Sequence, residues 1–482
     1  MKRAAGARTL LALALLALLG SAAVGGALAY LQSQGATPRA LAPYLLHRTS
    51  GHNDLIEGTG RVVAGMLLRL DRGAGQGYAL PPLTVGAQPG ALAAAGGNER
   101  LVASVDEARR AFARAVPGDL ITFLPGSYAV KGTIFASRPG LEDAPIVVRA
   151  ARPGTVTIAF NSSEGFAVSA PYWRFENLDI RGACRHDDNC QHAFHVVGRA
   201  HHFVARNNTI RDFNAHFKIN GQKGVFPDHG LIESNTLSNG GARRTSRPVT
   251  PVDLVGASDW VLRANLIRDF VKRGGDGTSY GAFAKGGAQR TVFERNVVLC
   301  EQALRGERGG ERGKRIGLSF GGGGTGKKYC RDRQCITEHD EGVMRANLVA
   351  GCSDVGIYLN SAASTRILDN TILDTAGVQV RFPQSGATLD GNLVDGPIRS
   401  DEGGGVRLGE NLATPIWQLY LGRHPQRALF ADPGRLDLRW RGETPRRGGP
   451  GAGPDLCGAA RVAPASYGAF EDFSACRAGA GR

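Results

Sequence analysis

The chain has 482 residues, a formal net charge of +15, 42% apolar and 7% aromatic residues, and 68 glycines. This length allows one large domain or two to three ordinary ones, and the composition argues against a core built mainly from aromatic rings. A basic surface attracts nucleic acid, anionic lipid or acidic polysaccharide, and charge alone does not choose among them.

The first predicted element is an apolar helix near the N-terminus. Basic residues precede an uncharged run over residues 9–30, which is long enough to span a bilayer. An A-x-A cleavage signal lies at residues 27–29, so residues 1–30 are predicted to be either a signal peptide or a single membrane anchor. Both alternatives predict an extracytoplasmic protein, either periplasmic or secreted, or anchored by residues 9–30. Both also argue against nucleic acid as the partner.

The strongest signal is an internal repeat centred on asparagine. Segments such as "FVARNNTIRDF" and "VLRANLIRDF" share apolar residues, then polar or small residues, then Asn and further apolar residues. The repeated asparagines are Asn177, Asn208, Asn235, Asn265, Asn296, Asn347, Asn370 and Asn392. Most spacings are 22 to 31 residues, as in the coils of a parallel β-solenoid, and one gap is 51 residues. Stacked coils bury a continuous core, and stacked asparagines can form a hydrogen-bonded ladder, so we interpret these residues as structural.

The ends of the repeat region predict its boundaries. Ser104 and Glu107 form a capping box for a short amphipathic helix that would cover the open end of the core. The boundary with the preceding part is predicted at residues 94–98. We predict four segments: residues 1–30, residues 31–97 without an assigned role, the solenoid over residues 98–440, and a closing segment over residues 441–482.

The eight cysteines predict disulfides rather than a metal site, because the chain is predicted to be exported and contains no C-x-x-C. Three pairs are close in sequence: Cys184 and Cys190, Cys330 and Cys335, and Cys457 and Cys476. Cys300 and Cys352 follow Asn296 and Asn347 by four and five residues. If these two coils stack directly, a disulfide between them would tie down the insertion in the long gap.

A second strand in each coil, for example "HFKING" or "AFAKGG", predicts a polar strip along the solenoid. With the aliphatic side chains facing in, the alternation along a strand turns the polar ones outward. The outward residues are His195, Lys218, Asp253, Lys285, Ser319, Tyr358 and Arg381, flanked by His216, Asn220 and Asn360. We call these ten residues the polar strip. A long polar strip on a basic protein suits an extended acidic sugar chain, although every solenoid has polar outer faces.

Two loops offer further candidates. Residues 184–195 contain His186, Asp187, Asp188, His192 and His195. They predict either a metal site or a polar loop closed by a disulfide, and we favour the loop. A basic loop carries Arg243, Arg244 and Arg247, which we interpret as solvated or as a contact for a carboxylate.

The chain resembles right-handed parallel β-helix proteins, and in particular the chondroitinase-B/alginate-lyase family of polysaccharide lyases. The segment "VASVDEARRAFARAVPGDLITFLPGSYAV" is similar to the opening helix and strands of that family. The segment "AFAKGGAQRTVFERNVV" is similar to the coil that carries the catalytic lysine, and "YGAFED" to the closing motif of many extracellular β-helix proteins. The resemblance covers roughly residues 100–475. It implies an all-β fold, a right-handed parallel β-helix with a short N-terminal capping helix.

The resemblance also implies a mechanism. In the family a lysine is the base, an arginine is the acid, and calcium held by Asn and Glu neutralises the uronate carboxylate, on which charge builds up. Lys285 matches the lysine and must lose its proton to act. The acidic ligands expected five and seven residues earlier fall on Tyr280 and Thr278, and the arginine of the next coil falls on Ser319 or Phe320. Arg381 is the arginine of the polar strip and the candidate acid.

Two functional hypotheses follow. The first is an exported β-helix protein that acts on acidic polysaccharide by lyase-like β-elimination, or by the chemically related C5-epimerisation, with calcium as the implied cofactor. The second is a non-catalytic module that binds polysaccharide of the cell envelope, with or without a membrane anchor. The absence of aromatic stacking platforms argues against a nucleic-acid partner. The sequence predicts no oligomeric state.

Overall fold

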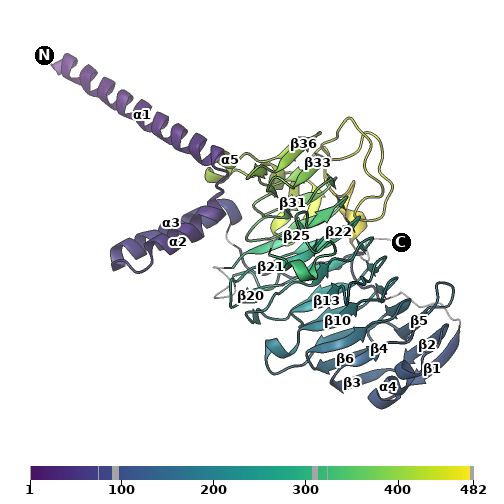
Figure 1. Ribbon diagram of the computed structural model, residues 1–482. Helices are drawn as coiled ribbons and strands as arrows, with labels where there is room; N and C mark the ends of the chain where they lie inside the picture. Colours follow the sequence, from purple (N-terminus) through teal and green to yellow (C-terminus); the bar gives the residue numbers. More distant parts are fainter. Residues whose placement is uncertain (1, 74, 90–96, 307–312, 323, 478–482) are drawn as a thin grey trace. The chain divides into compact units, whose positions relative to one another are not determined.

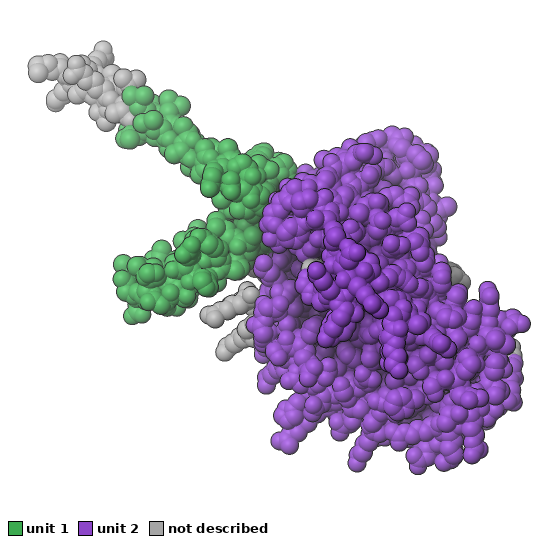
Figure 2. All heavy atoms as spheres, in the orientation of Figure 1, with its two compact units in different colours: residues 1–74, 414–425 green, residues 75–413, 426–482 purple. Residues whose placement is uncertain are grey.

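A computed structural model describes residues 2–73, 75–89, 97–306, 313–322 and 324–477 of the chain. The chain divides into two compact units (Figure 2). Unit 1 comprises Met1–Ala74 and Thr414–Pro425, and unit 2 comprises Gly75–Ala413 and Gln426–Arg482. The boundary predicted at residues 94–98 falls mostly on residues outside this description.

Unit 2 is built of coils that stack along one axis, so that their strands form three parallel sheets (Figure 1). Sheet 1 contains β1 (Asn98–Val102), β2 (Asp119–Phe123), β5 (Ile146–Ala150), β8 (Trp173–Glu176), β11 (Val204–Arg206), β14 (Leu231–Glu233), β18 (Val261–Arg263), β23 (Val292–Glu294), β27 (Val343–Arg345), β30 (Thr365–Leu368), β33 (Gly386–Asp390) and β36 (Gly405–Leu408). Sheet 2 contains β4 (Ile134–Ala136), β7 (Glu164–Val168), β10 (His192–Val197), β13 (Ala215–Asn220), β17 (Val252–Val255), β21 (Ser279–Lys285), β25 (Arg315–Gly321), β29 (Ile357–Asn360), β32 (Val378–Arg381) and β35 (Ile398–Asp401). Sheet 3 contains β3 (Gly126–Lys131), β6 (Val156–Asn161), β9 (Asp179–Gly182), β12 (Thr209–Arg211), β15 (Thr236–Ser238), β19 (Leu266–Arg268), β24 (Val297–Leu299), β28 (Leu348–Ala350), β31 (Thr371–Leu373), β34 (Leu393–Val394) and β37 (Leu412–Ala413).

The chain visits the three sheets in turn, and each strand pairs in parallel with its counterpart in the next coil. This is the right-handed parallel β-helix that the sequence predicts, with the hand that crossovers between parallel strands nearly always take. Three short pairs lie outside the sheets: β16 (Arg243–Arg244) with β20 (Lys272–Arg273), β22 (Ala288–Gln289) with β26 (His339–Asp340), and β38 (Phe430–Asp432) with β39 (Asp437–Trp440). The helices are α1 (Lys2–Ser33), α2 (Pro38–Thr49), α3 (Asp54–Arg72), α4 (Val105–Ala113), α5 (Ile416–Tyr420) and α6 (Pro425–Ala428).

An asparagine ladder fixes one turn of every coil from Asn208 onward. In each step the Nδ2 of one asparagine donates to the Oδ1 of the next, over 3.0 Å for Asn265 and Asn296. That same Oδ1 also accepts the backbone N–H of the preceding asparagine, at 3.0 Å from Asn265 N. The ladder runs through Asn208, Asn235, Asn265, Asn296, Asn347, Asn370, Asn392 and Asn411. Because the members before Asn411 are fully buried, these bonds satisfy polar groups that water cannot reach.

The prediction that Asn177 is the first member of the ladder is wrong. Asn177 has φ of +62° and accepts a hydrogen bond from Asn207, whose φ is +56°. Both therefore hold the left-handed position just before the ladder, and Leu178 occupies the ladder position that pairs with Asn208. Asparagine tolerates this backbone conformation better than most residues, which explains its occurrence at both places.

Helix α4 covers the first coils, as the capping box predicts. Ser104 Oγ accepts the N–H of Glu107 at 3.2 Å, which starts the helix. Phe112 is buried on the opposite side of the helix from solvent and stacks on Trp173, with ring centroids 5.2 Å apart. The helix thus closes the apolar interior that the coils leave open at this end.

All four predicted disulfides are present: Cys184–Cys190, Cys300–Cys352, Cys330–Cys335 and Cys457–Cys476. Cys300 and Cys352 follow β24 and β28, which are direct neighbours in sheet 3. The bridge therefore joins successive coils on either side of the long insertion.

Unit 1 contains helices that the sequence analysis did not predict. Within the described residues, the one helix long and apolar enough to cross a membrane covers Leu13–Ser33, and its side chains are not buried. Helices α2 and α3 follow it and form an antiparallel hairpin (Figure 1). A buried ion pair closes the base of the hairpin, since Arg39 Nε donates to Asp71 Oδ1 at 2.9 Å.

Candidate functional site

The polar strip lies on sheet 2, and the register of that sheet orders its members. His195 lies beside Lys218, Lys218 beside Asp253, and Asp253 beside Phe283. Lys285 lies two residues further along β21. Lys285 is therefore displaced by two residues from the row that Lys218 and Asp253 form. The side chains of Asp253 and Lys285 still face away from the core because the alternation is unchanged.

The register also moves the arginine position that the family resemblance implies. Ala284 pairs with Phe320, so Lys285 lies beside Gly321 in the next coil. Neither Ser319 nor Phe320 is therefore the neighbour of Lys285. A glycine at the neighbouring position supplies no side chain that could act as an acid.

One polar network of the site centres on His195. Its Nδ1 lies 2.8 Å from Glu164 Oε1, and its Nε2 lies 3.0 Å from Asn220 Oδ1. Asn220 Nδ2 donates to Gly221 O at 3.0 Å, which fixes the amide with its oxygen toward the histidine. Both ring nitrogens thus face acceptors, an arrangement that a doubly protonated imidazolium satisfies. The hydrogen bond with His195 also lowers the pKa of the Glu164 carboxyl.

A second pair follows in the next two coils. Lys218 Nζ donates to Asp253 Oδ1 at 2.9 Å, and the carboxylate is almost completely buried while the lysine is a quarter exposed. His192, at the start of β10, lies close enough to these charged groups for them to affect its pKa. The pKa of His192 is lowered to about 4, mainly by burial and also by His195 and Lys218, while Asp253 and Glu164 oppose the change. In this part of the strip each basic side chain is therefore paired with a carboxylate.

Lys285 is a partly buried lysine with a specific packing. Its ammonium lies over the ring of Phe283, 4.6 Å from the centroid. Its alkyl stem passes Gly322, where an added Cβ would come within 3.1 Å of Lys285 Cδ. Burial lowers the pKa of Lys285, and the charge of Lys218 lowers it too, while Asp253 and Glu338 oppose the change. A larger fraction of this lysine is therefore neutral than of a solvated one.

Glu338 holds the loop next to Lys285 in place. Its Oε2 accepts the N–H of Gly286 at 2.7 Å and the hydroxyl of Thr325 at 3.0 Å. The side chain is buried, so this carboxylate supports the loop rather than facing a ligand. Sequence reasoning missed both Glu338 and Glu164, because only the stacking of coils brings them to the strip.

Other members of the polar strip lie elsewhere. His216 and Ser319 are completely buried, so the expectation that they form part of an exposed strip is wrong. Tyr358 and Asn360 are also buried and bonded to each other, with 3.1 Å between Asn360 Nδ2 and Tyr358 Oη. His216 contacts Ser238 O, and Ser319 lies between Phe283 and Tyr358 of the neighbouring strands, which alternation alone does not reveal.

Arg381 belongs to the far end of the strip. Its Nη2 donates to Glu402 Oε1 at 2.6 Å. Strands β21 and β32 are three steps apart in sheet 2, which is about 14 Å at the usual strand spacing. Lys285 and Arg381 are therefore too far apart to act on the same glycosidic bond.

We expect the buried His216 to make the fold sensitive to acid. Burial lowers the pKa of His216 to about 3, whereas an unfolded histidine titrates near about 6.5. As the pH falls from the unfolded value toward the folded one, the unfolded chain binds a proton that the folded chain does not. Stability then decreases by up to about 1.4 kcal/mol per pH unit from this residue.

The test is the pH dependence of urea unfolding for the wild type and for His216→Gln. Glutamine can still donate to Ser238 O, which His216 Nε2 contacts at 3.1 Å. The variant should lose less stability than the wild type between neutral and acidic pH. Equal slopes for the two proteins would show that His216 does not cause the acid sensitivity.

The residues around Lys285 do not fit a calcium ion. Calcium takes six to eight oxygen ligands, largely carboxylates and carbonyls. Here Asp253 is bound by Lys218, Glu164 faces His195, and Glu338 is buried against backbone and hydroxyl donors. These carboxylates lie on different coils, and each is already engaged.

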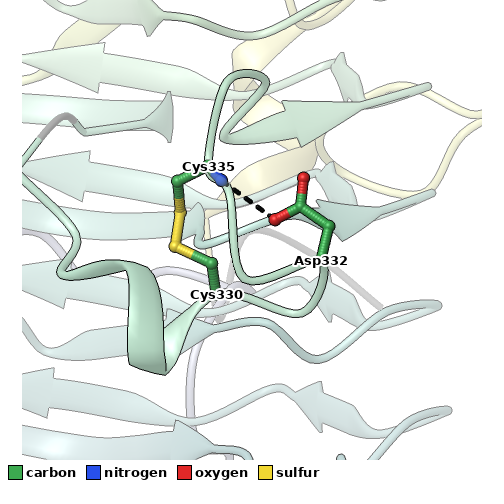
Figure 3. Close-up of side chains that lie close together, drawn as sticks. All are labelled: Cys330, Asp332 and Cys335. Carbon is green, nitrogen blue, oxygen red and sulfur yellow. Dashed lines mark hydrogen bonds between the residues drawn. A yellow bond between two sulfur atoms is a disulfide. The ribbon is translucent and has the colours of Figure 1, made fainter.

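The other two metal candidates are also engaged in protein contacts. In the loop over residues 184–195, Asp187 pairs with Arg243 at 2.9 Å, and Asp188 accepts from Thr245. Within the described residues, one group of possible ligands lies close together: Cys330, Asp332 and Cys335 (Figure 3). The cysteines form a disulfide, and Asp332 Oδ1 accepts the N–H of Cys335 at 2.9 Å. Neither group offers free thiolates or a convergent set of open ligands.

The chain shows limited similarity to known proteins. No known family model matches it. Pectate lyase L of Dickeya chrysanthemi is 36% identical over 87 residues, which are 15% of this chain and 20% of that protein. The chain thus matches about a fifth of the length of this curated relative.

Solved structures of polysaccharide lyases match over a larger part of the chain. Pectate lyase Pel9A is 15% identical, with 75% of this chain and 90% of that chain covered and a TM-score of 0.47. An alginate lyase from Paenibacillus sp. str. FPU-7 is 14% identical, with 66% and 99% covered and a TM-score of 0.33. The PL6 family lyase Pedsa3628 from Pseudopedobacter saltans is 12% identical, with 71% and 96% covered and a TM-score of 0.34. At this level of similarity, activity has to be argued from the residues of the chain itself.

Proposed function

We propose that this chain is an extracytoplasmic enzyme that cleaves acidic, uronate-containing polysaccharide by β-elimination, with Lys285 as the general base. The reaction removes the proton next to the uronate carboxylate, so negative charge builds on that carboxylate before the glycosidic bond breaks. The site must therefore supply a neutral base and a nearby positive charge.

The observation that carries the proposal is the environment of Lys285. A solvated lysine is almost fully protonated at neutral pH and cannot act as a base. Burial and the charge of Lys218 lower the pKa of Lys285, which raises its neutral fraction. The side chain also remains partly exposed on the outer face of sheet 2, where an extended sugar chain has access.

The chain offers two basic side chains, each held in place by a carboxylate partner, where the family resemblance implies calcium. Lys218 and His195 lie side by side on neighbouring strands. Both point away from the core, and each is about a quarter exposed. We propose that they bind the carboxylates of the polymer. Arg381, about three strand steps from Lys285, would contact another sugar of the same polymer rather than the leaving oxygen.

The second candidate is a non-catalytic polysaccharide-binding protein. The contact of the Lys285 ammonium with Phe283 favours it, because a cation held over a ring is partly satisfied without a substrate. The engaged carboxylates around the site also leave no calcium ligands of the kind that the family uses. This alternative keeps the same sugar-binding face and removes only the chemistry.

The experiment is an assay of the full-length protein in detergent on polygalacturonate, alginate and glycosaminoglycans, each with calcium and with a chelator. Ultraviolet absorbance follows the unsaturated uronate, and co-sedimentation with the polymer follows binding. Product that forms equally well in the chelator supports the proposal that Lys218 and His195, rather than calcium, bind the carboxylates of the polymer. Binding without product on every polymer supports the second candidate, and product that forms only with calcium contradicts the role given to Lys218 and His195.

A further inference from the structure

Helix α3 exposes an apolar surface that nothing in unit 1 covers among the described residues. The exposed apolar side chains are Leu55, Ile56, Val62, Val63, Met66 and Leu70, with exposed fractions of 80%, 41%, 61%, 40%, 55% and 37%. At about 100° per residue they lie within about a third of the helix circumference. We call this surface the apolar arc.

A different side of α3 packs inside the hairpin. Gly60, Ala64 and Asp71 are its buried residues. An added Cβ at Gly60 would come within 2.2 Å of Thr49 Oγ1 on α2, which shows how closely the two helices approach. The apolar arc therefore is not the inner face of the hairpin, and water-soluble helices rarely expose such a surface without a partner.

The position of the hairpin in the chain identifies the partner as a lipid surface. The apolar helix over Leu13–Ser33 ends four residues before α2 begins at Pro38. Four extended residues reach at most about 14 Å. If the apolar helix spans a bilayer, α2 therefore starts at or near the headgroup layer, which extends about 5–8 Å beyond the hydrocarbon core.

Contacts within unit 1 hold this junction in place. Tyr420 Oη donates to Ala36 O at 3.0 Å, and Trp417 N donates to Gln32 Oε1 at 3.3 Å. At the other end of the hairpin, His424 Nε2 lies 2.9 Å from Leu70 O. The segment over residues 414–425 thus ties the end of α1 and the end of α3 together, so the hairpin cannot swing freely away from the membrane.

Basic side chains border the apolar arc. Arg61 and Arg69 are exposed on the polar side of α3, and Arg48 is exposed at the end of α2. An amphipathic helix with basic residues beside an apolar face is the pattern of helices that lie in the interface of anionic membranes.

We propose that the α2–α3 hairpin lies on the bilayer surface, with the apolar arc of α3 inserted among the headgroups and the first acyl carbons of anionic lipid. It forms a second membrane contact beside α1. This inference rests on the predicted membrane anchor and is independent of the lyase activity.

The experiment uses a single environment-sensitive fluorophore in the full-length protein. All eight cysteines are in disulfides, so an introduced cysteine is the one free thiol. The matched variants are Val62→Cys in the apolar arc and Arg61→Cys on the polar side, which are adjacent in sequence and both strongly exposed. Leu18→Cys reports on the span itself. Each labelled protein is reconstituted into vesicles of zwitterionic and anionic phospholipid.

We expect the label at residue 62 to be quenched several-fold more by lipid-attached nitroxide than the label at residue 61, and the label at 61 to be quenched more by aqueous iodide. Equal quenching by iodide at both sites would overturn the proposal, even if the label at residue 18 lies in lipid. Protection of residue 62 from both quenchers would also overturn it, because a protein surface then covers the arc. A label at residue 18 that stays in water would remove the anchor and the proposal together.

Discussion

Replacing Lys285 with alanine is expected to lower the rate of uronate elimination by about 10²- to 10⁴-fold, the usual contribution of a general base. Arginine at this position should fail as well, because its guanidinium stays protonated and cannot accept the proton. The rate of the wild type should rise with pH as Lys285 loses its proton. Because burial lowers the pKa of Lys285, this rise should lie below the range of an ordinary lysine. Initial rates of product absorbance over a pH series measure all three effects.

Lys314→Ala is the matched control, since this lysine lies next to β25 in the following coil with its side chain 70% exposed. It should leave the rate and its pH dependence unchanged. Circular dichroism and urea unfolding of each variant separate a lost base from a lost fold. A Lys285→Ala protein with wild-type rate would exclude this residue as the base.

Replacing Asn296 with alanine is expected to cause a large loss of stability. The side chain is buried and joins three coils: it accepts from Asn265 N and Nδ2, and it donates to Leu262 O and Asn347 Oδ1. Alanine removes these partners from Asn265 N and Leu262 O, and it removes one of the two bonds of Asn265 Nδ2 and of Asn347 Oδ1. Each group left unsatisfied costs about 1–3 kcal/mol. Allowing for relaxation, we expect a loss of about 3–6 kcal/mol, measured by guanidinium unfolding followed through tryptophan fluorescence.

The control is Asn177→Gly, which removes an asparagine that the sequence repeat includes and the structure places outside the ladder. Asn177 accepts one hydrogen bond, from Asn207, and glycine keeps its left-handed backbone without strain. Its loss should therefore cost about 1 kcal/mol or less. Equal losses for the two variants would mean that the ladder does not carry the stability of the coil stack.

The fold could be predicted from the sequence because each coil repeats the same requirement. A buried asparagine at one turn needs a partner above and below, so its spacing along the chain measures the coil length. The error at Asn177 arose because asparagine suits two adjacent positions, the ladder and the left-handed residue before it. The doublet Asn207–Asn208 occupies both and was the available hint.

The site was only half predictable. Alternation gave the outward direction of Lys218, Asp253 and Lys285, but not which residues lie side by side. That depends on hydrogen-bond register between strands of different lengths, for which the local sequence of β21 contains no signal. Burial of His216 and Ser319 depends on residues of other coils, and the same is true of the support that Glu338 gives to the loop beside Lys285.

The helical hairpin could have been found from the sequence. Apolar residues recur in α3 at helical spacing, and Asn53 caps the helix by accepting the N–H of Ile56 at 3.0 Å. The asparagine repeat gave no indication of this segment, because the segment does not contain the repeat.

The asparagine ladder continues without a change of hydrogen bonding from Asn296 to Asn347, although these two rungs are 51 positions apart in the sequence. The Cys300–Cys352 disulfide links the two ends of the same insertion covalently. The coil stack therefore tolerates large differences in what lies between two rungs, since lengthening a loop adds little to its closure entropy. An architecture of this kind can acquire a new recognition loop by insertion at one turn while the coils on either side keep their sequence. Selection for a different polysaccharide would then act on inserted turns, and the scaffold would be inherited unchanged.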